Sequence, residues 1–168
     1  GYTPHSLSVS GQVETLMPWN AGATERLFAA TSTGNIYNTT SADEILTAET
    51  GEYILSEDGR TLVLDSVNSV LQVTGLTNGR LQYVNFTTTG GNYICAVNGA
   101  DAYRVYNGTT WAKSGDGAPY DITGVTSSTL IGINVFKNRL WFVEVGTLEA
   151  WYLPVNSIGG AAASLDMS

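Results

Sequence analysis

The stretch LQYVNFTTTGGNYICAVNGADAYRVYNGTTW, residues 81–111, carries the pattern that decides the fold. Short runs of β-branched and aromatic residues alternate with Gly and Asn steps, and helical periodicity is hard to find along the chain. Asn98-Gly99 and Asn107-Gly108 favour tight turns, because Asn and Gly tolerate positive φ. The stretch therefore predicts antiparallel strands joined by hairpin turns.

Residues 15–40 and 131–155 repeat this order of features. In each copy a strand ends near an aromatic anchor, an apolar strand follows a turn, and a third strand carries Tyr or Trp. The anchors are Trp19, Phe86 and Phe136, and the spacing of the last two is close to that of a propeller blade.

The repeat predicts one all-β domain over residues 1–168, made of β-propeller-like blades or a partial propeller of antiparallel meander sheets. A β-sandwich is the alternative, because it also uses short alternating strands. Three sets of strands, with no further set to close the arrangement, would leave sheet edges unpaired. The hypothesis is therefore a larger propeller, or sheets that close against neighbouring subunits.

The longer spacing from Trp19 to Phe86 predicts an insert over residues 41–73. It contains a hairpin, EYILSEDGRTLVLD, and a concentration of acidic residues. Charge on a solvated edge hairpin prevents sheet-to-sheet sticking, and a docking knob for a neighbouring subunit is the second interpretation. The final segment, SIGGAAASLDMS, has the composition of a linker.

The formal net charge is −8, with only 7 Lys and Arg residues. Ordinary nucleic-acid binding needs cations that neutralise phosphates, so this balance disfavours it. A negative wall past which duplex DNA slides without specific binding is compatible with the same charge. No apolar stretch approaches the length of a membrane span, so we expect no membrane insertion.

The sequence offers little catalytic chemistry. Cys95 and His5 are the only residues of their types, which excludes a Cys/His zinc site, and Cys95 is predicted to be a buried, inert thiol. A carboxylate pair at Glu144 and Glu149 is more simply explained as acids on the solvent face of a strand. The segment from Asp116 to Asp121 suits a turn as well as a calcium loop. We therefore expect no enzyme, no catalytic residue, no metal and no cofactor.

The aromatic residues are the best candidates for contact with a partner. Trp111, next to a turn, is predicted to be exposed, and Tyr106, Trp151 and Tyr152 complete the candidate interface. Trp141 lies in the most apolar strand and is predicted to be in the core.

Three strings have a wider resemblance: GYTPH near the start, LTNGRLQYVNFTTTGGNYICAVNGADAYRVYNGTTW in the middle, and INVFKNRLWFVE followed by WYLPVNSIGGAA. They resemble a family of tailed-phage virion proteins, similar in pattern to the β-propeller tail-hub and nozzle (tail tubular) proteins of short-tailed phages. The resemblance covers residues 1–40 and 74–168. It implies a homo-oligomeric ring with a central channel for DNA ejection, and brings no catalytic residues.

The expected function is a non-catalytic structural protein of the bacteriophage virion, in the tail or head–tail connection, that contacts other virion subunits. A carbohydrate- or receptor-binding β-module of the adhesin kind is the alternative. A glycan-cleaving enzyme on a propeller is a third hypothesis and requires two carboxylates in one cleft.

Overall fold

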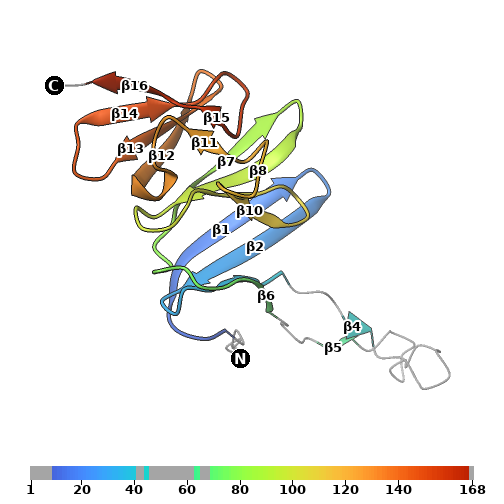
Figure 1. Ribbon diagram of the computed structural model, residues 1–168. Helices are drawn as coiled ribbons and strands as arrows, with labels where there is room; N and C mark the ends of the chain where they lie inside the picture. The colour runs from blue at the N-terminus through green and yellow to red at the C-terminus, as the bar shows by residue number, and fades with distance from the viewer. Residues whose placement is uncertain (1–8, 41–43, 46–62, 65–68, 167–168) are drawn as a thin grey trace, which may run out of the picture.

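The computed structural model describes residues 9–40, 44–45, 63–64 and 69–166, and in these residues the chain is almost entirely β-structure (Figure 1). Three four-stranded sheets dominate, each a run of antiparallel strands. The one helical element in these ranges is a single 3₁₀ turn, Ser127–Thr129. The all-β prediction is confirmed, and the sheets are blade-like and open at their edges.

Each sheet begins with a long hairpin and ends with shorter strands. The first has the order β1 (Val13–Ala21), β2 (Thr24–Thr31), β3 (Ile36–Asn38) and β6 (Val70–Val73). The second contains β7 (Gln82–Thr88), β8 (Gly91–Val97), β9 (Arg104–Tyr106) and β10 (Trp111–Lys113). The third contains β12 (Leu130–Phe136), β13 (Arg139–Glu144), β14 (Glu149–Tyr152) and β16 (Ala163–Asp166).

Two small pairs complete the described strands. β4 (Glu44–Ile45) pairs with β5 (Val63–Leu64), and β11 (Ile122–Thr123) runs parallel to β15 (Gly160–Ala161). The β11–β15 pair ties the loop after the second sheet to the loop before β16.

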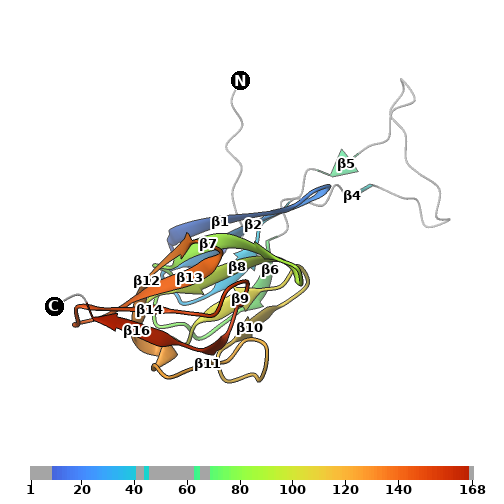
Figure 2. The ribbon, with the colours of Figure 1, turned by 90° about the horizontal axis from the view of Figure 1, so that it is seen from above.

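The three sheets are stacked, with the second in the middle (Figures 1 and 2). The alternation of side chains along β8 explains this position, because successive residues point to opposite faces of a strand. Ile94 and Ala96 pack toward the first sheet, while Cys95 and Val97 pack toward the third. The second sheet is therefore buried on both faces.

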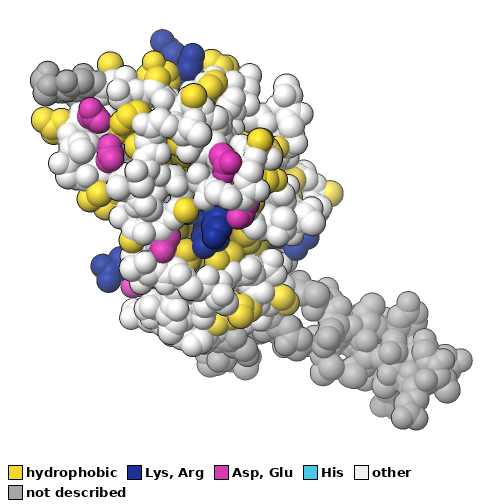
Figure 3. All heavy atoms as spheres, in the orientation of Figure 1, with side chains coloured by type: hydrophobic (Ala, Val, Ile, Leu, Met, Phe, Trp, Pro, Cys, Tyr) yellow, Lys and Arg dark blue, Asp and Glu magenta, His cyan; other side chains and the backbone are white. Residues whose placement is uncertain are grey.

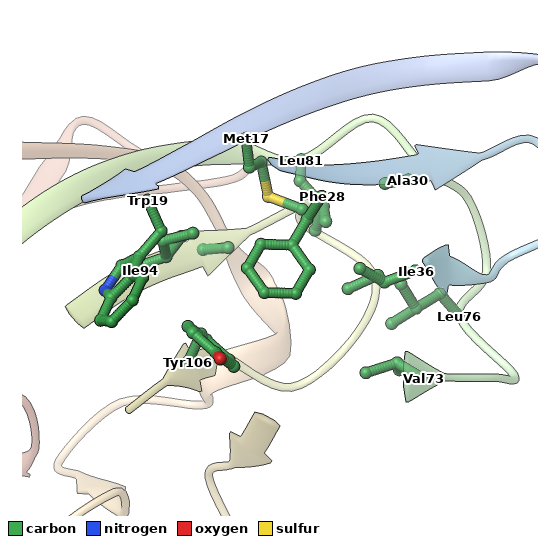
Figure 4. Close-up of a cluster of buried hydrophobic side chains, with 11 residues drawn as sticks. Met17, Trp19, Phe28, Ala30, Ile36, Val73, Leu76, Leu81, Ile94 and Tyr106 are labelled. Carbon is green, nitrogen blue, oxygen red and sulfur yellow. The ribbon is translucent and has the colours of Figure 1, made fainter. Parts of the chain in front are cut away.

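The core between the first and second sheets is rich in aromatic rings (Figure 4). Phe28 lies 4.6 Å from Tyr106, and Trp19 meets the same Tyr106 edge-on at 5.4 Å, measured between ring centroids. The Trp19 Nε1–H also donates to the carbonyl oxygen of Asn92, at 3.1 Å. This bond places the tip of the β1–β2 hairpin beside the tip of the β7–β8 hairpin.

The core between the second and third sheets is separate from the first. Tyr103 packs edge-on against Phe142 at 5.6 Å, and Leu130, Leu140 and Leu153 surround them. The Tyr103 hydroxyl donates to the carbonyl oxygen of Ile158, at 2.9 Å. Two cores in series explain why the sheets form one stack.

The structure changes the limits of two predicted segments. Residues 70–73, assigned to the insert from sequence, form β6 and pair with β3, so they belong to the first sheet. Most of the predicted hairpin over residues 52–65 lies outside the described residues. The predicted linker at the end of the chain contains β15 and β16, and β16 is the fourth strand of the third sheet.

Candidate functional site

The most distinctive exposed surface is the side of the third sheet that faces away from the second sheet. Strand register assigns its members, because paired residues share a face. Asn134, Trp141, Tyr152 and Ala163 form one row across the sheet, and Gly132, Val143, Ala150 and Leu165 form the next. With Phe136 and Arg139 at the hairpin tip, these residues are called here the outer face of the third sheet.

Aromatic and cationic groups meet on this face. The Trp141 and Tyr152 rings lie 4.7 Å apart with 35° between their planes, and the Arg139 guanidinium lies 5.3 Å from the Tyr152 ring. The Trp141 Nε1–H donates to the Phe136 carbonyl at 3.3 Å, and Arg139 donates to the Leu153 carbonyl at 3.2 Å. The rings and the cation are therefore held in fixed positions.

The prediction that Trp141 is a core residue is wrong. Its strand neighbours Leu140 and Phe142 fill the core, whereas Trp141 points to the opposite face and is half-buried. Tyr152, predicted as a contact residue, is half-buried beside it. The strand is apolar on both faces, which concealed the direction of Trp141.

Trp151 has a structural partner. It packs on the inner face of the third sheet, and its Nε1–H donates to Glu144 Oε2 at 2.9 Å. The other oxygen, Glu144 Oε1, accepts a hydrogen bond from the Thr129 hydroxyl at 2.8 Å. Glu144 thus joins the 3₁₀ turn to β14, and both of its oxygens are occupied.

Tyr106 and Trp111, two residues of the candidate interface, pack against the core between the first two sheets. Tyr106 is 1% exposed, in the core between the first two sheets. Trp111 is half-buried against the same core and meets Phe28 edge-on at 5.3 Å. The turn before Trp111 is correctly expected, since the Asn107 side chain accepts the backbone N–H groups of Thr109 and Thr110. The Trp ring folds back onto the stack.

The carboxylates between Asp116 and Asp121 stabilise a turn. Asp116 Oδ2 accepts the Lys113 backbone N–H at 2.9 Å, and Asp121 Oδ1 accepts the Gly115 and Gly117 N–H groups at 2.6 and 3.3 Å. Within the ranges that the structure describes, no group of three or more His, Cys, Asp or Glu side chains could hold a metal ion. His5 lies outside those ranges.

Cys95 is a buried free thiol, as predicted. It is fully shielded from solvent, and burial raises the pKa of its thiol from 9.0 to about 12. Burial likewise raises the pKa of the neighbouring Tyr103 well above its usual value. A thiol that stays protonated is a poor nucleophile, so Cys95 acts as a core residue.

Three open hollows lie on the described surface. One of about 500 Å³ lies between the end of the β7–β8 hairpin and the loops beside β11 and β15, and Tyr93, Asp121 and Asn156 are among the residues that line it. A second, of about 420 Å³, lies on the first sheet beside Glu25 and Leu27. The third, of about 380 Å³, lies on the third sheet beside Trp141 and Val143, and Gln82 of the second sheet also lines it.

Charge is spread thinly over the described surface. In Figure 3 the Asp and Glu side chains are scattered and do not gather into one patch. Glu14 and Arg80 form an ion pair of 3.2 Å where the first sheet meets the second. Most of the acidic residues of the predicted insert lie outside the described residues.

Comparison with known proteins gives no relative: no family model, no curated protein and no solved structure matches this chain. In the described residues, no helix is long and apolar enough to cross a membrane.

Proposed function

We propose that this protein is a non-catalytic structural subunit of a phage virion, in the tail or head–tail connection, and that it assembles with its own copies into a ring around the DNA channel. The observation that carries the proposal is the stack of three blade-like sheets whose two end faces are open and partly apolar. Such a stack is a natural building unit for a larger closed assembly.

The occupied carboxylates support a role without catalysis. Glu144, one of the two carboxylates considered as a catalytic pair with Glu149, accepts hydrogen bonds with both oxygens. Asp116 and Asp121 hold backbone N–H groups of their own turn. These hydrogen bonds give each of the three carboxylates a structural role.

The first strand of each sheet lacks cationic side chains, which is compatible with a channel wall that binds DNA weakly. β1, β7 and β12 lie toward one side of the stack, and closure would turn that side to the axis (Figure 2). The sequences of these three strands contain one carboxylate, Glu14, and no Lys or Arg. Lys137 and Arg139 lie at a hairpin tip, and Arg104 lies on β9. A wall without cations releases no counterions from DNA and so binds it weakly.

Negative-stain electron microscopy of the purified chain, with light scattering for the mass, tests the proposal. We expect rings or short tubes with a central channel, built from several copies. Compact single particles with the mass of one 17.8 kDa chain would contradict it.

The second candidate is a carbohydrate-binding module, favoured by the half-exposed Trp141 and Tyr152 rings and by the hollow beside Asp121 and Asn156. Rings of this kind stack on sugar faces, and polar groups then fix the orientation. A glycan array probed with the wild type and with Trp141→Ala tests it. Binding that the substitution abolishes would favour this function over the structural one.

A further inference from the structure

We infer that the outer face of the third sheet binds the exposed face of the first sheet of a second copy, in the same orientation in which the sheets stack within one chain. The contact is head-to-tail, since the two faces differ. The inference rests on the proposed function only in taking the chain to be a self-assembling subunit, and it names the surfaces that meet.

The first argument is that the chain already makes this kind of contact twice. The first sheet packs on the second, and the second packs on the third, each time through a continuous apolar core. The two end faces are the surfaces on which the next sheet of the series would lie. A third repetition of the same packing needs no new kind of interface.

The second argument is the apolar character of both end faces. On the outer face of the third sheet, Phe136 is 58% exposed, Val143 45% and Leu165 49%. The exposed face of the first sheet is formed by the residues paired with one another on the side away from the core: Leu16, Pro18, Asn20, Glu25, Leu27, Ala29, Tyr37 and Leu71. Leu16 is 49% and Leu71 48% exposed. Contiguous exposed apolar residues mark interaction surfaces.

Part of the first-sheet face is already covered. Ala29 and Tyr37 are buried, and the Ser10 backbone N–H donates to the Tyr37 hydroxyl at 3.2 Å. The open part is the half that contains Leu16, Pro18 and Leu27, beside the hollow of about 420 Å³. The hollow of about 380 Å³ on the third sheet lies beside Trp141 and Val143. Each face thus combines projecting apolar side chains with a depression that can receive them.

The third argument is charge. Glu25 is exposed at the tip of the β1–β2 hairpin, where it accepts a hydrogen bond from Asn20 at 2.8 Å. Lys137 and Arg139 occupy the tip of the β12–β13 hairpin, the corresponding place in the third sheet. The bond from Trp19 to Asn92 shows that hairpin tips lie side by side in this stack. Stacking a second copy in that orientation brings Glu25 close to the two cations, which fixes the direction of the contact.

A pair of blocking substitutions tests the inference. Val143→Glu introduces a charge on the third-sheet face, and Leu27→Glu does so on the first-sheet face. Sedimentation velocity of the wild type should show species larger than the 17.8 kDa chain, whereas each variant alone should weaken association at least tenfold. Val155→Glu is the matched control, since Val155 is 48% exposed but belongs to neither face.

Mixing the two blocked variants gives the decisive measurement. Each retains the face that the other lacks, so an equimolar mixture should form a one-to-one complex that neither variant forms alone. Circular dichroism and urea unfolding confirm that both variants are folded. Glu25→Lys should weaken association about twofold to fivefold, the range of an exposed ion pair.

The outcomes separate this inference from the proposed function. Association of the wild type that neither Val143→Glu nor Leu27→Glu weakens would overturn the inference and leave a ring built through other surfaces. Complexes formed through the two faces, without a channel under the microscope, would overturn only the proposed function. A wild type that stays monomeric at the highest soluble concentration would overturn both.

Discussion

Glu144 shows how a carboxylate on a strand can have a structural role through hydrogen bonds. Its two oxygens accept hydrogen bonds from Thr129 and Trp151, which belong to different elements. Removing the acceptor leaves the half-buried Trp151 N–H without this partner. We expect Glu144→Ala to lower the free energy of unfolding by about 1–3 kcal/mol.

Urea unfolding followed by Trp fluorescence measures this effect. Glu149→Ala is the matched control, because the described hydrogen bond of Glu149 is donated by its backbone N–H and not by its side chain. It should change the stability by less than about 0.5 kcal/mol. Equal losses in the two variants would show that the Glu144 contacts are energetically neutral.

Cys95 links stability to alkaline pH. The folded protein keeps the thiol proton up to a pKa of about 12, whereas an unfolded chain releases it near 9.0. Below pH 9 the stability is unaffected by this group. Above pH 9 the unfolded state binds fewer protons, so the free energy of unfolding falls as the pH rises, by up to about 1.4 kcal/mol per pH unit.

Urea unfolding at several pH values from 8 to 11 checks this expectation. Cys95→Ala removes the titrating group and should give a shallower decline than the wild type, even if its stability at pH 8 is lower. The native thiol should also resist alkylation by iodoacetamide until the protein unfolds. Identical declines in both proteins, or rapid alkylation of the native chain, would contradict the expectation.

The sequence predicts the burial of a residue best where the residues on both sides of it are also apolar. Cys95, between Ile94 and Ala96, was expected to be buried and is. Trp141 lies on the outer face of the third sheet and not in the core, because strand alternation gives two possible faces and only the packing of the sheets decides which face is covered. The acceptor of the Trp151 N–H is likewise set by tertiary contacts that have no local signature.

At the scale of elements, the turn between β2 and β3 depends on a glycine. Gly34 has φ +76°, and a Cβ there would overlap with the Leu76 carbonyl oxygen of the segment that enters the second sheet. Leu76 N–H in turn donates to the Gly34 carbonyl at 2.9 Å. We expect Gly34→Ala to lower the free energy of unfolding by about 2–4 kcal/mol, from strain and steric overlap together.

The variant Gly22→Ala separates the contribution of backbone strain from that of steric overlap. Gly22 has φ +70°, but a Cβ there meets nothing within 4 Å. Gly22→Ala should lower the free energy of unfolding by about 1–2 kcal/mol, from the strain of the left-handed backbone alone. Thermal or urea unfolding of both variants measures the difference, and equal losses would mean that the Leu76 segment moves aside.

The three repeats were predictable as elements, because their turns and apolar runs are local signals. Some short strands are not predicted from the sequence, among them β6 and β16. β16 has the sequence ASLD, whose small residues read as linker, and its pairing with β14 overrides that weak propensity. The sequence places β6 in the insert, because β6 pairs with β3 only after the intervening residues 39–69. A pairing between residues so far apart in the chain has no local sequence signal.

At the scale of the whole molecule, we expect the insert to be separable from the stack. Asn38 and Val70 are direct partners in the β3–β6 pair, so the two ends of the intervening segment lie side by side. A chain in which a short Gly/Asn turn replaces residues 42–66 should keep its two cores. We expect a cooperative unfolding transition within about 1 kcal/mol of the wild type.

Circular dichroism and urea unfolding of this deletion variant check the expectation, and sedimentation velocity asks whether the insert takes part in assembly. Loss of cooperative unfolding would show that the insert supports the first sheet. Unchanged folding with lost association would identify it as the docking knob considered from its sequence.

The arrangement of the three sheets was the part of the fold that the sequence could not define. Propeller-like and sandwich folds share their strand patterns, and a middle sheet buried on both faces lacks the apolar–polar alternation that identifies an outer face. The structure, and not the sequence, therefore identifies the outer faces of the first and third sheets.

The pairing of β3 with β6 also has a consequence for how the chain folds. The strands of the second sheet are joined by short turns, so their contacts form between residues close in sequence and lose little chain entropy. β6 can join β3 only after the two ends of the segment over residues 39–69 have come together, and the entropy loss of such a closure grows with the logarithm of the segment length. Nucleation therefore favours β7–β10, with the first sheet completed late. Lengthening the insert would slow that last step while barely changing the final equilibrium.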